Sequence, residues 1–328
     1  MDVNDLKKYF NVKAIAQRLQ ALPPLKSSVV DTFYTRKVNH PFDKVGRSDI
    51  MAVGAPTPLI ARGAPSLPLS SGGVSLDDYE PFEIANHQFF TAADMLRMRN
   101  LDEQSVQARL AGVDDNLRRI CRATTEGIAA TSLTGTITWP VALEGGGTEI
   151  YTVTFGSPLS YTVPSADKWD AATVNMRKVF AQLDDVESLI RDNGYGGNVE
   201  FWAGKDAYTA LLALSEVYGE NPKAKLRVEV SADGVSVGGY RIKKMSETYI
   251  HPDTGVATYK VAPGKIMAYA TDAVHTLFYC ALDDLDANLQ PMPYFSKPID
   301  TKDRLASRSL AGRNRFRYRC RRLSAGLR

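Results

Sequence analysis

The 328-residue sequence predicts an α+β fold. An apolar stripe at helical spacing runs through residues 106–133, which indicates a helix longer than most in globular proteins. Alternating segments follow at residues 136–139 and 149–155, and such alternation is typical of strands. Because the later helices and strands mix without regular strand–helix–strand order, a doubly wound parallel sheet is not indicated.

The composition is that of a folded protein. Charged residues make up 23% and hydrophobic residues 44% of the chain, which argues against a wholly disordered protein. No apolar run approaches the roughly 18 residues that a membrane span needs, so we expect no transmembrane segment. The first residues are acidic and polar, so we expect no secretory signal. Cys121, Cys280 and Cys320 lie far apart, which favours free thiols in a reducing compartment.

The charge is unevenly distributed along the chain. Residues 301–328 hold ten of the 40 Lys and Arg side chains but one of the 37 Asp and Glu side chains, so residues 1–300 carry a net charge of −6. The whole chain has a net charge of +3. A basic block of this kind usually marks an interaction tail rather than part of a core.

Two short segments open the chain. A helical pattern of apolar residues runs from Leu6 to Leu22 and stops at Pro23. Residues 28–34 then form a strand-like run rich in β-branched and aromatic side chains. Neither segment is long enough to bury its own apolar side chains, so we expect each to dock on another surface.

Residues 53–76 form an unusual segment. Its four prolines and four glycines exclude a helix or a central strand, and Arg62 is its one charged residue. The low charge and the aliphatic content argue against a solvated linker. The segment is either a loop that covers its own domain or an arm that lies on another subunit. In the second interpretation, the residues that form the contact between subunits are Pro56, Pro58, Leu59, Ile60, Arg62, Leu67 and Leu69.

Two helices are predicted next. A short one begins at Thr91, where Asp94 completes an acidic variant of the capping box. The long apolar stripe then ends at Gly135, where a C-cap glycine is expected, so the second helix is a rod of about 45 Å. The side chains predicted to form its buried face are Leu110, Val113, Leu117, Ile120 and Ile128.

The remaining elements alternate between strands and helices. The strand-like segments after the long helix form a hairpin through a glycine-rich turn at residues 144–147. Further helices are predicted at residues 171–193 and 206–214, with a short strand at 199–202 between them. The pattern then predicts three β segments, at residues 234–245, 248–261 and 265–270.

No constellation in the sequence supports an active site. The four histidines have no helical zinc spacing, and there is no G-x-S-x-G nucleophile elbow. Cys121 falls on the apolar stripe and is interpreted as a small core residue, as is Cys280. The glycines at residues 194–197 follow a helix and precede a strand, the reverse of a dinucleotide-binding turn. We therefore predict no catalytic residue, no cofactor site and no metal site.

The basic tail allows two interpretations. Arg313, Arg315, Arg317, Arg319 and Arg321 alternate with other residues, so an extended strand would carry their charges at period two. Such a strip could neutralise nucleic-acid phosphates, but it could equally be a solvated terminus or pair with acidic protein surfaces. The residues assigned to a DNA contact or a protein contact are Arg313, Arg315, Arg317, Arg319, Arg321 and Arg322.

The order of these parts resembles that of a known family. The segments that carry the resemblance are GAPTPLIARG at residues 54–63, LTGTI at 133–137, WD at 169–170, FWAGKDAY at 201–208, VAPGKIMA at 261–268 and YFSK at 294–297. Together with the long helix, they resemble the lambda-type capsid protein E family of tailed-phage major capsid proteins, which has the Hong Kong 97-type fold. The resemblance covers residues 1 to about 300 and ends where arginines replace the family's last apolar strands.

The resemblance implies a division of the chain into five segments. Residues 1–36 would be the N-terminal arm, and residues 37–90 the extended loop, or E-loop. Residues 91–168 would form the spine helix and β-hairpin of the peripheral domain. Residues 169–290 would form mainly the axial domain with returning strands, and residues 291–328 would return to the peripheral domain and form the basic tail.

The resemblance also implies a structural function rather than an enzymatic one. The protein would be a major capsid protein whose copies form the pentamers and hexamers of an icosahedral shell around double-stranded DNA. Its implied partners are further copies of itself, portal, scaffold or decoration proteins, and the packaged DNA, with no membrane. The implied location is the virion capsid, assembled in the bacterial host cytoplasm. The alternative is an α+β nucleic-acid-binding protein that uses its basic C-terminal tail.

Overall fold

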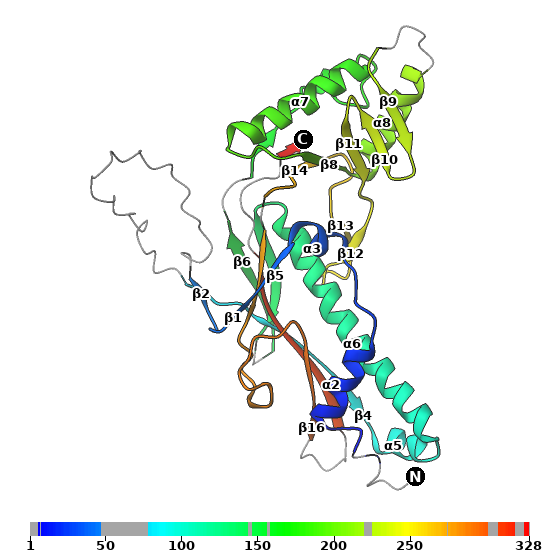
Figure 1. Cartoon of the computed structure of the whole chain (residues 1–328), viewed down its shortest axis with the longest axis vertical. Helices are drawn as coiled ribbons and strands as arrows, with labels where there is room; N and C mark the ends of the chain where they lie inside the picture. The colour runs from blue at the N-terminus through cyan, green and yellow to red at the C-terminus, as the bar shows by residue number, and fades with distance from the viewer. Residues whose placement is uncertain are drawn as a thin grey trace, which may run out of the picture. The chain divides into compact units, whose positions relative to one another are not determined.

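The computed structural model describes residues 6, 8–46, 78–143, 146–155, 158–219, 225–273, 275–300, 308–318 and 325–327. Helices and strands are mixed along the chain, which confirms the α+β class (Figure 1). The helices are α2 (Val12–Ala21), α3 (Ser28–Phe33), α5 (Ala92–Arg99), α6 (Glu103–Ser132), α7 (Met176–Asp192) and α8 (Lys205–Gly219).

The chain divides into two compact units, each made of segments far apart in sequence. Unit 1 consists of Met1–Leu25, Lys37–Cys121 and Leu277–Arg319. Unit 2 consists of Lys26–Arg36, Arg122–Thr276 and Cys320–Arg328. The long helix α6 therefore contributes its first part to unit 1 and its last part to unit 2.

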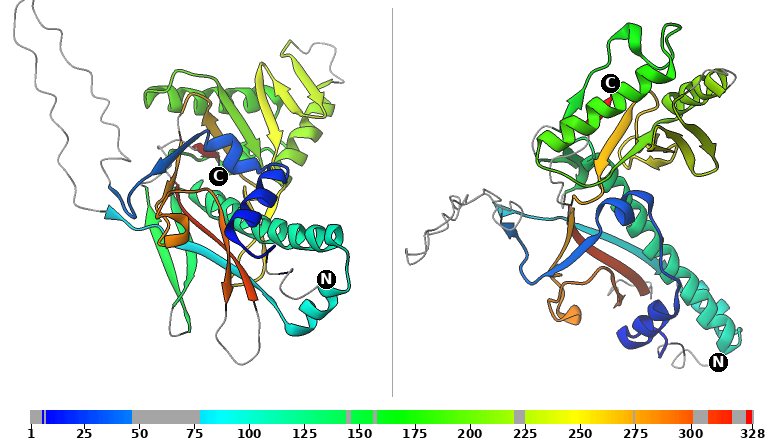
Figure 2. Two further views of the ribbon diagram at one scale, coloured as in Figure 1. Left: turned by 60° about the horizontal axis from the view of Figure 1, so that its bottom comes forward. Right: turned by 45° about the horizontal axis from the view of Figure 1, so that its top comes forward.

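The sheet of unit 1 is built around its most C-terminal strand. Its strands are β1 (Arg36–His40), β4 (Glu83–Phe90), β15 (Thr276–Cys280), β16 (Phe295–Asp300) and β17 (Arg308–Tyr318). β17 pairs antiparallel with β4, β15 and β16, so it lies inside the sheet (Figure 2). A separate two-stranded ladder joins β2 (Val45–Gly46) to β3 (Asp78–Tyr79).

The core of unit 1 forms between α6 and the N-terminal segment. Leu110 and Leu117 of α6 are buried together with Phe10 and Ile15 from the start of the chain, and Phe90 of β4 meets Phe10 edge-on with ring centroids 5.4 Å apart. The N-terminal helix thus docks within its own unit. The expectation that this segment docks on another surface is confirmed, and that surface lies in its own chain.

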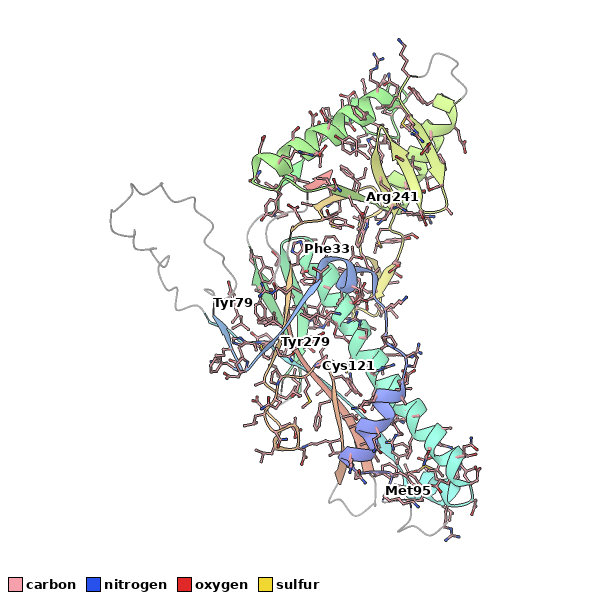
Figure 3. The ribbon with its side chains drawn as sticks, viewed as in Figure 1. Phe33, Tyr79, Met95, Cys121, Arg241 and Tyr279 are labelled. Atoms are coloured by element: carbon pink, nitrogen blue, oxygen red, sulfur yellow. The ribbon has the colours of Figure 1, made fainter. Side chains whose placement is uncertain are left out.

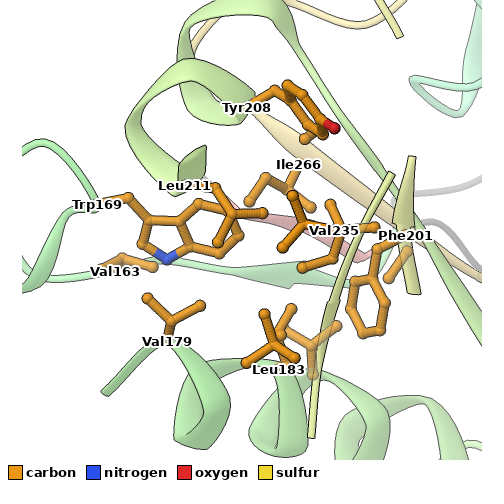
Figure 4. Packing of buried hydrophobic residues seen from close by; sticks show 14 of the residues in the cluster. Val163, Trp169, Val179, Leu183, Phe201, Tyr208, Leu211, Val235 and Ile266 are labelled. Atoms are coloured by element: carbon orange, nitrogen blue, oxygen red, sulfur yellow. The ribbon is translucent and has the colours of Figure 1, made fainter. Parts of the chain in front are cut away.

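Unit 2 contains a seven-stranded sheet covered by two helices. The strand order is β7-β18-β14-β8-β11-β10-β9. Its strands are β7 (Ser160–Tyr161), β8 (Val199–Ala203), β9 (Val228–Ser231), β10 (Gly234–Val237), β11 (Tyr240–Lys244), β14 (Ile266–Ala270) and β18 (Ala325–Leu327). The apolar faces of α7 and α8 pack on it, and one cluster of buried side chains includes Val179 and Leu183 of α7, Leu211 of α8 and Phe201 of β8 (Figure 4).

Two further hairpins of unit 2 meet over the long helix. They are β5 (Thr136–Ala142) with β6 (Thr148–Thr154), and β12 (Thr248–Ile250) with β13 (Ala257–Tyr259). The ring centroids of Trp139 in β5 and Tyr249 in β12 lie 6.1 Å apart, and both side chains lie next to Gly127 of α6. The glycine therefore allows both hairpins to approach the helix closely.

Several predicted elements have different boundaries, and one has a different type. Within the helical pattern of residues 6–22, α2 covers Val12–Ala21, and the helix predicted at residues 206–214 runs on to Gly219. Residues 28–34 do not form a strand: residues 28–33 form helix α3, because a carboxylate from α6 satisfies the free N–H groups at its first turn. The helix predicted from residue 171 begins at Met176 instead, since Asn175 is the N-cap whose side chain accepts the N–H of Lys178. The capping box predicted at Thr91 and Asp94 is confirmed.

Candidate functional site

The apolar segment 53–76 lies outside the described residues, and with it lie Pro56, Pro58, Leu59, Ile60, Arg62, Leu67 and Leu69. The structure does describe where the chain leaves for this segment and where it returns. Val45 of β2 lies opposite Tyr79 of β3 in an antiparallel pair, and Tyr79 is labelled in Figure 3. Both side chains pack with Phe278 and Cys280 of β15. The segment therefore departs from and returns to one anchored position in unit 1.

The side chains predicted for the buried face of α6 differ in burial. Leu110 and Leu117 are buried, whereas Val113 and Ile128 are half-buried. Ile120 is 41% exposed, so its assignment to the core is wrong. The buried line runs through Leu117 and Cys121, four residues apart, and Ile120 is turned by about 100° from Cys121 around the helix.

Three of the six C-terminal arginines assigned from the sequence lie on a described strand, and the other three lie outside the described residues. Arg313, Arg315 and Arg317 lie on β17, whereas Arg319, Arg321 and Arg322 are not described. In the backbone register of β17, Arg315 is opposite Glu83 and Arg313 is opposite Phe295. These three arginines thus lie on a paired strand of the sheet of unit 1.

A buried ion pair fastens α2 to α6 in unit 1. Nε of Arg18 lies 2.8 Å from Oδ2 of Asp114, and the Asp114 side chain is fully buried. Burial raises the pKa of Asp114, while the hydrogen bond and the charge of Arg18 oppose that rise. Arg18 also donates to the backbone carbonyl of Tyr9 at 3.0 Å. A polar residue therefore occupies the buried line of α6 and ties the N-terminal segment to it.

A second cluster of charges holds α3 in unit 2. The Glu126 carboxylate accepts the N–H of Val29 at 2.7 Å and that of Val30 at 3.0 Å, both in the first turn of α3. Nζ of Lys260 donates to Glu126 at 2.8 Å and also to Glu247. Two hydrogen bonds from α3 to Glu126, and two from Lys260 to Glu126 and Glu247, thus fix the start of this six-residue helix. We name this cluster the α3 clamp.

Ser28, the first residue of α3, lies next to the lysine of the α3 clamp, but the pair is not arranged for nucleophilic catalysis. Nζ of Lys260 lies 2.7 Å from Oγ of Ser28. Burial of Lys260 lowers its pKa, but the hydrogen bonds and charges of Glu126 and Glu247 outweigh burial, so the pKa is raised. A lysine that stays protonated cannot take the proton of a serine hydroxyl. The cluster therefore acts as a structural clamp.

The loop of residues 282–290, between β15 and β16, holds a strained backbone. Asn288 has φ 52° and Leu289 has φ 54°, both in the left-handed region. That conformation costs roughly 1–2 kcal/mol per residue that is not glycine. Nζ of Lys297 lies 2.8 Å from a carboxylate oxygen of each of Asp284 and Asp286 and closes the loop. We name residues 282–290 the leucine loop, because Leu285 and Leu289 are exposed there.

The described residues contain no group of three His, Cys, Asp or Glu side chains arranged to hold a metal ion. Cys121 and Cys280 are buried free thiols, as the sequence predicted for core residues. Burial raises the pKa of the Cys121 thiol to about 11, so it stays protonated and unreactive at neutral pH. Gly194 follows the C-cap residue of α7 at φ 90°, which fits a helix end rather than a phosphate-binding turn.

Sequence reasoning missed the residues of the two ionic clusters. Asp114 and Glu126 lie on α6 among apolar positions, and their partners Arg18 and Lys260 are about 100 residues or more away along the chain. The one available signal was at Asp114, which falls on the predicted apolar stripe, four residues after Leu110 and three before Leu117. No local spacing points to their partners.

Comparison with known structures shows similarity in fold. A prophage capsid protein from Escherichia coli CFT073 superposes with a TM-score of 0.62 at 13% identity, over 97% of this chain and 98% of that one. A phage-related protein from Bordetella bronchiseptica RB50 superposes with a TM-score of 0.51 at 10% identity, over 97% and 96% of the two chains. No curated protein sequence matches the chain. None of the described helices is long and apolar enough to span a membrane.

Comparison with sequence families identifies the chain. The sequence model of the family described as phage major capsid protein E matches residues 11–310. This match takes in the N-terminal helix, the segment 53–76, the whole of α6, nearly all of unit 2 and the first residues of β17. The chain belongs to the phage major capsid protein E family.

Proposed function

We propose that this chain is the repeating subunit of the icosahedral head of a tailed double-stranded DNA phage or prophage, in which copies form pentamers and hexamers. The observation that carries the proposal is the family match over residues 11–310. The family is one of structural proteins that form capsids. The fold shared with the E. coli prophage capsid protein along nearly the full length of both chains supports the same assignment.

The apolar segment 53–76 is proposed as the arm that lies on a neighbouring subunit. Two observations support this assignment. The segment has one charged residue, Arg62, and eight prolines and glycines, so it lacks the means to fold on itself. Its ends are held together by the pairing of Val45 with Tyr79, which gives a fixed base from which an arm can extend. The N-terminal helix is not proposed as a contact between subunits, because it docks on α6 of its own chain.

The basic C-terminal strand is proposed as part of the shell wall. β17 pairs with β4 along Glu83–Phe90 and with β16 along Phe295–Asp300, so residues 308–313 of β17 pair with both strands. Arg315 has the acidic Glu83 opposite it, and Arg308 has Asp300 opposite it. Cross-strand pairs of opposite charge stabilise a sheet. This arrangement favours a protein-facing role for these arginines over contact with packaged DNA.

The five-segment division of the chain is retained as a proposal about function. It assigns residues 1–36 to the arm, 37–90 to the E-loop, 91–168 to the spine helix and hairpin, 169–290 to the axial domain, and 291–328 to the return and tail. The proposed partners are portal, scaffold or decoration proteins and the enclosed DNA, and the proposed place of assembly is the bacterial host cytoplasm. The alternative of a nucleic-acid-binding protein gains no support from the family match.

Electron microscopy of the purified protein tests the proposed function. We expect the full chain, expressed in bacteria and concentrated, to form capsomer rings or closed shells of uniform diameter in negative stain. Sedimentation velocity measures the same assembly in solution, as species far larger than the 36.0 kDa subunit. A chain that stays monomeric at every concentration, with or without co-expressed proteins of its own gene neighbourhood, would contradict the proposal.

A further inference from the structure

The leucine loop holds two apolar side chains in solvent. Leu285 is 83% exposed and Leu289 is 52% exposed, although the residue between them, Ala287, is buried. The Asp284 side chain accepts the N–H of Asp286 at 2.9 Å, and the carbonyl of Asp284 accepts the N–H of Leu289 at 3.2 Å. The loop is therefore anchored, and its backbone directs the leucines outward.

The anchored loop is unfavourable for an isolated subunit. Leu289 adopts a left-handed backbone conformation, which a leucine side chain disfavours, and the exposed leucines gain nothing from burial within the chain. Backbone strain that persists in a structure is a pointer to function. An outside surface that covers Leu285 and Leu289 would account for both features.

The charge of the loop restricts what can cover it. Residues 282–290 contain Asp283, Asp284 and Asp286 and no basic residue, and Lys297 pairs with Asp284 and Asp286. Phe42 lies beside the loop, since its carbonyl accepts the N–H of Ala281 at 3.3 Å, and Phe42 is exposed too. A covering surface should therefore be apolar at its centre and basic at its rim.

One described surface of unit 1 has this composition. Leu96 in α5 is 56% exposed and Leu101, just after α5, is 37% exposed. Arg97 and Arg99 alternate with these positions, and Arg109 of α6 lies nearby, 3.8 Å from Asp94. We name Leu96, Arg97, Arg99, Leu101 and Arg109 the α5 patch.

The positions of Arg97 and Arg99 in the α5 patch can be explained by the helix alone, but the exposure of the leucines beside them cannot. Arg97 and Arg99 lie in the last turn of α5, where positive charge is favourable at a helix C-terminus. Their position in the helix does not account for the exposed Leu96 and Leu101 beside them. The ion pairs of Asp94 with Arg97 and Arg109 are long, at 4.0 and 3.8 Å, so the guanidinium groups keep capacity for a second partner.

We propose that the leucine loop of one copy of this chain binds the α5 patch of a second copy. This inference rests on the proposed function, which supplies the second copy. The loop and α5 lie at separate places in unit 1 in both Figure 1 and Figure 2, so they do not meet within one chain. Contact between two different surfaces is head-to-tail and can close into a ring of identical copies. Opposite charges at the rims set the register of the contact.

Cysteine trapping tests the contact directly. One chain carries Leu285→Cys and a second carries Leu96→Cys, and each is oxidised alone or mixed before assembly. We expect a disulfide-linked dimer in the mixture and none with either chain alone, because a disulfide needs Cβ atoms about 3.5–4.5 Å apart. A mixture without the linked dimer, or equal dimer formation with one chain alone, overturns the proposal.

Charge exchange provides an independent test. We expect Asp283→Arg and Arg97→Asp each to reduce assembly at least tenfold, as measured by sedimentation velocity, and the double variant to restore it. Leu285→Asp should abolish assembly, whereas Leu285→Met should not, and circular dichroism should show that all variants are folded. If both single charge variants assemble like the original chain, or if the double variant fails to recover, the proposed pairing is wrong.

The two tests separate this inference from the proposed function. Cross-linking of the mixed chains without any shells would support the contact and contradict the shell. Shells from the original chain, together with no cross-link and no effect of charge exchange, would support the shell and contradict the contact. If the protein forms no shells and the mixed chains give no cross-link, the proposed function and the proposed contact are both contradicted.

Discussion

The indole ring of Trp139 occupies the space that a side chain on Gly127 would need. A Cβ atom on Gly127 would lie 2.6 Å from Cη2 of Trp139 and 3.2 Å from Cδ2 of Tyr249. For comparison, a Cβ atom on Gly112, which also lies in α6, would have nothing within 4 Å. One glycine of the long helix is thus required by packing, and the other is not.

Gly127→Ala is expected to destabilise the protein by about 1–3 kcal/mol, because the added methyl group forces the Trp139 ring out of its place. Gly112→Ala is the matched control and should stabilise the protein by up to about 1 kcal/mol through helix propensity alone. Urea denaturation followed by tryptophan fluorescence measures both. Equal effects of the two substitutions would show that the ring does not depend on Gly127.

Asp114→Ala is expected to destabilise the protein by about 3–5 kcal/mol, because it leaves the largely buried Arg18 without its carboxylate. Glu229→Ala removes the exposed ion pair with Arg227 and should cost no more than about 1 kcal/mol. The unfolding free energies of the two variants give the comparison. A loss below about 1 kcal/mol for Asp114→Ala would mean that the pair does not fasten α2.

The stabilisation of α3 by the α3 clamp should be greatest near neutral pH and should decrease at acidic and at alkaline pH. Burial raises the pKa of Glu247, but its hydrogen bonds to Lys260 and Ser28 outweigh burial and lower it, so its contribution is lost as pH falls through that lowered value. The pKa of Lys260 is raised, so its contribution is present below the ordinary lysine value and is lost as pH rises through the raised one.

Hydrogen exchange measures the clamp at the N–H groups of Val29 and Val30, which Glu126 accepts. After correction for the intrinsic exchange rate, we expect protection to be constant near neutral pH and to fall below about pH 4 and above about pH 10. In the Glu247→Gln variant, the loss of protection at acidic pH should be smaller, while the loss at alkaline pH should remain. Protection that is independent of pH over the whole range would contradict the role of these charges.

Removal of residues 56–69 should leave a folded, soluble subunit that does not form shells. The chain ends of this segment are already joined through β2 and β3, so a shorter connection closes without disturbing unit 1. Circular dichroism and the urea midpoint report folding, and electron microscopy reports assembly. Normal shells from the shortened chain would show that the segment is not the arm between subunits.

Replacement of Arg313, Arg315 and Arg317 by glutamine distinguishes a wall strand from a DNA contact. In the wall interpretation, stability falls by up to about 1 kcal/mol, because the replacement removes the cross-strand pair of opposite charge at Arg315 and Glu83, and shells that form retain DNA normally. Stable shells of normal shape that retain little DNA would support the phosphate interpretation. Comparison of thermal unfolding with the nucleic-acid absorbance of purified particles makes the distinction.

Patterns within one element predicted much of the fold. The long helix, the hairpin after it, the capping box at Thr91 and the α+β class follow from spacing and turn residues, because these depend on neighbours a few residues apart. The error at residues 28–34 has a non-local cause. Val29 and Val30 favour a strand by themselves, but Glu126 accepts their N–H groups from a helix almost 100 residues away and stabilises α3.

The candidate surfaces were harder to predict than the elements. Leu285 and Leu289 are ordinary residues of a loop in sequence, and their exposure follows from the anchoring by Asp284 and Lys297. The stripe of α6 predicted Leu110 and Leu117 as buried but not that Asp114 would share their line. A sequence pattern marks apolar positions, whereas the partner of a buried charge depends on which distant segment packs there.

The central position of β17 has a consequence for the time course of synthesis. β4 emerges from the ribosome early, yet its partner along Glu83–Arg315 is made more than 200 residues later, and β18 joins the sheet of unit 2 later still. Pairing between such distant segments forms slowly because a long chain must close first. Both sheets therefore remain incomplete until β17 and β18 have been made, and each unit completes its sheet only near the end of synthesis.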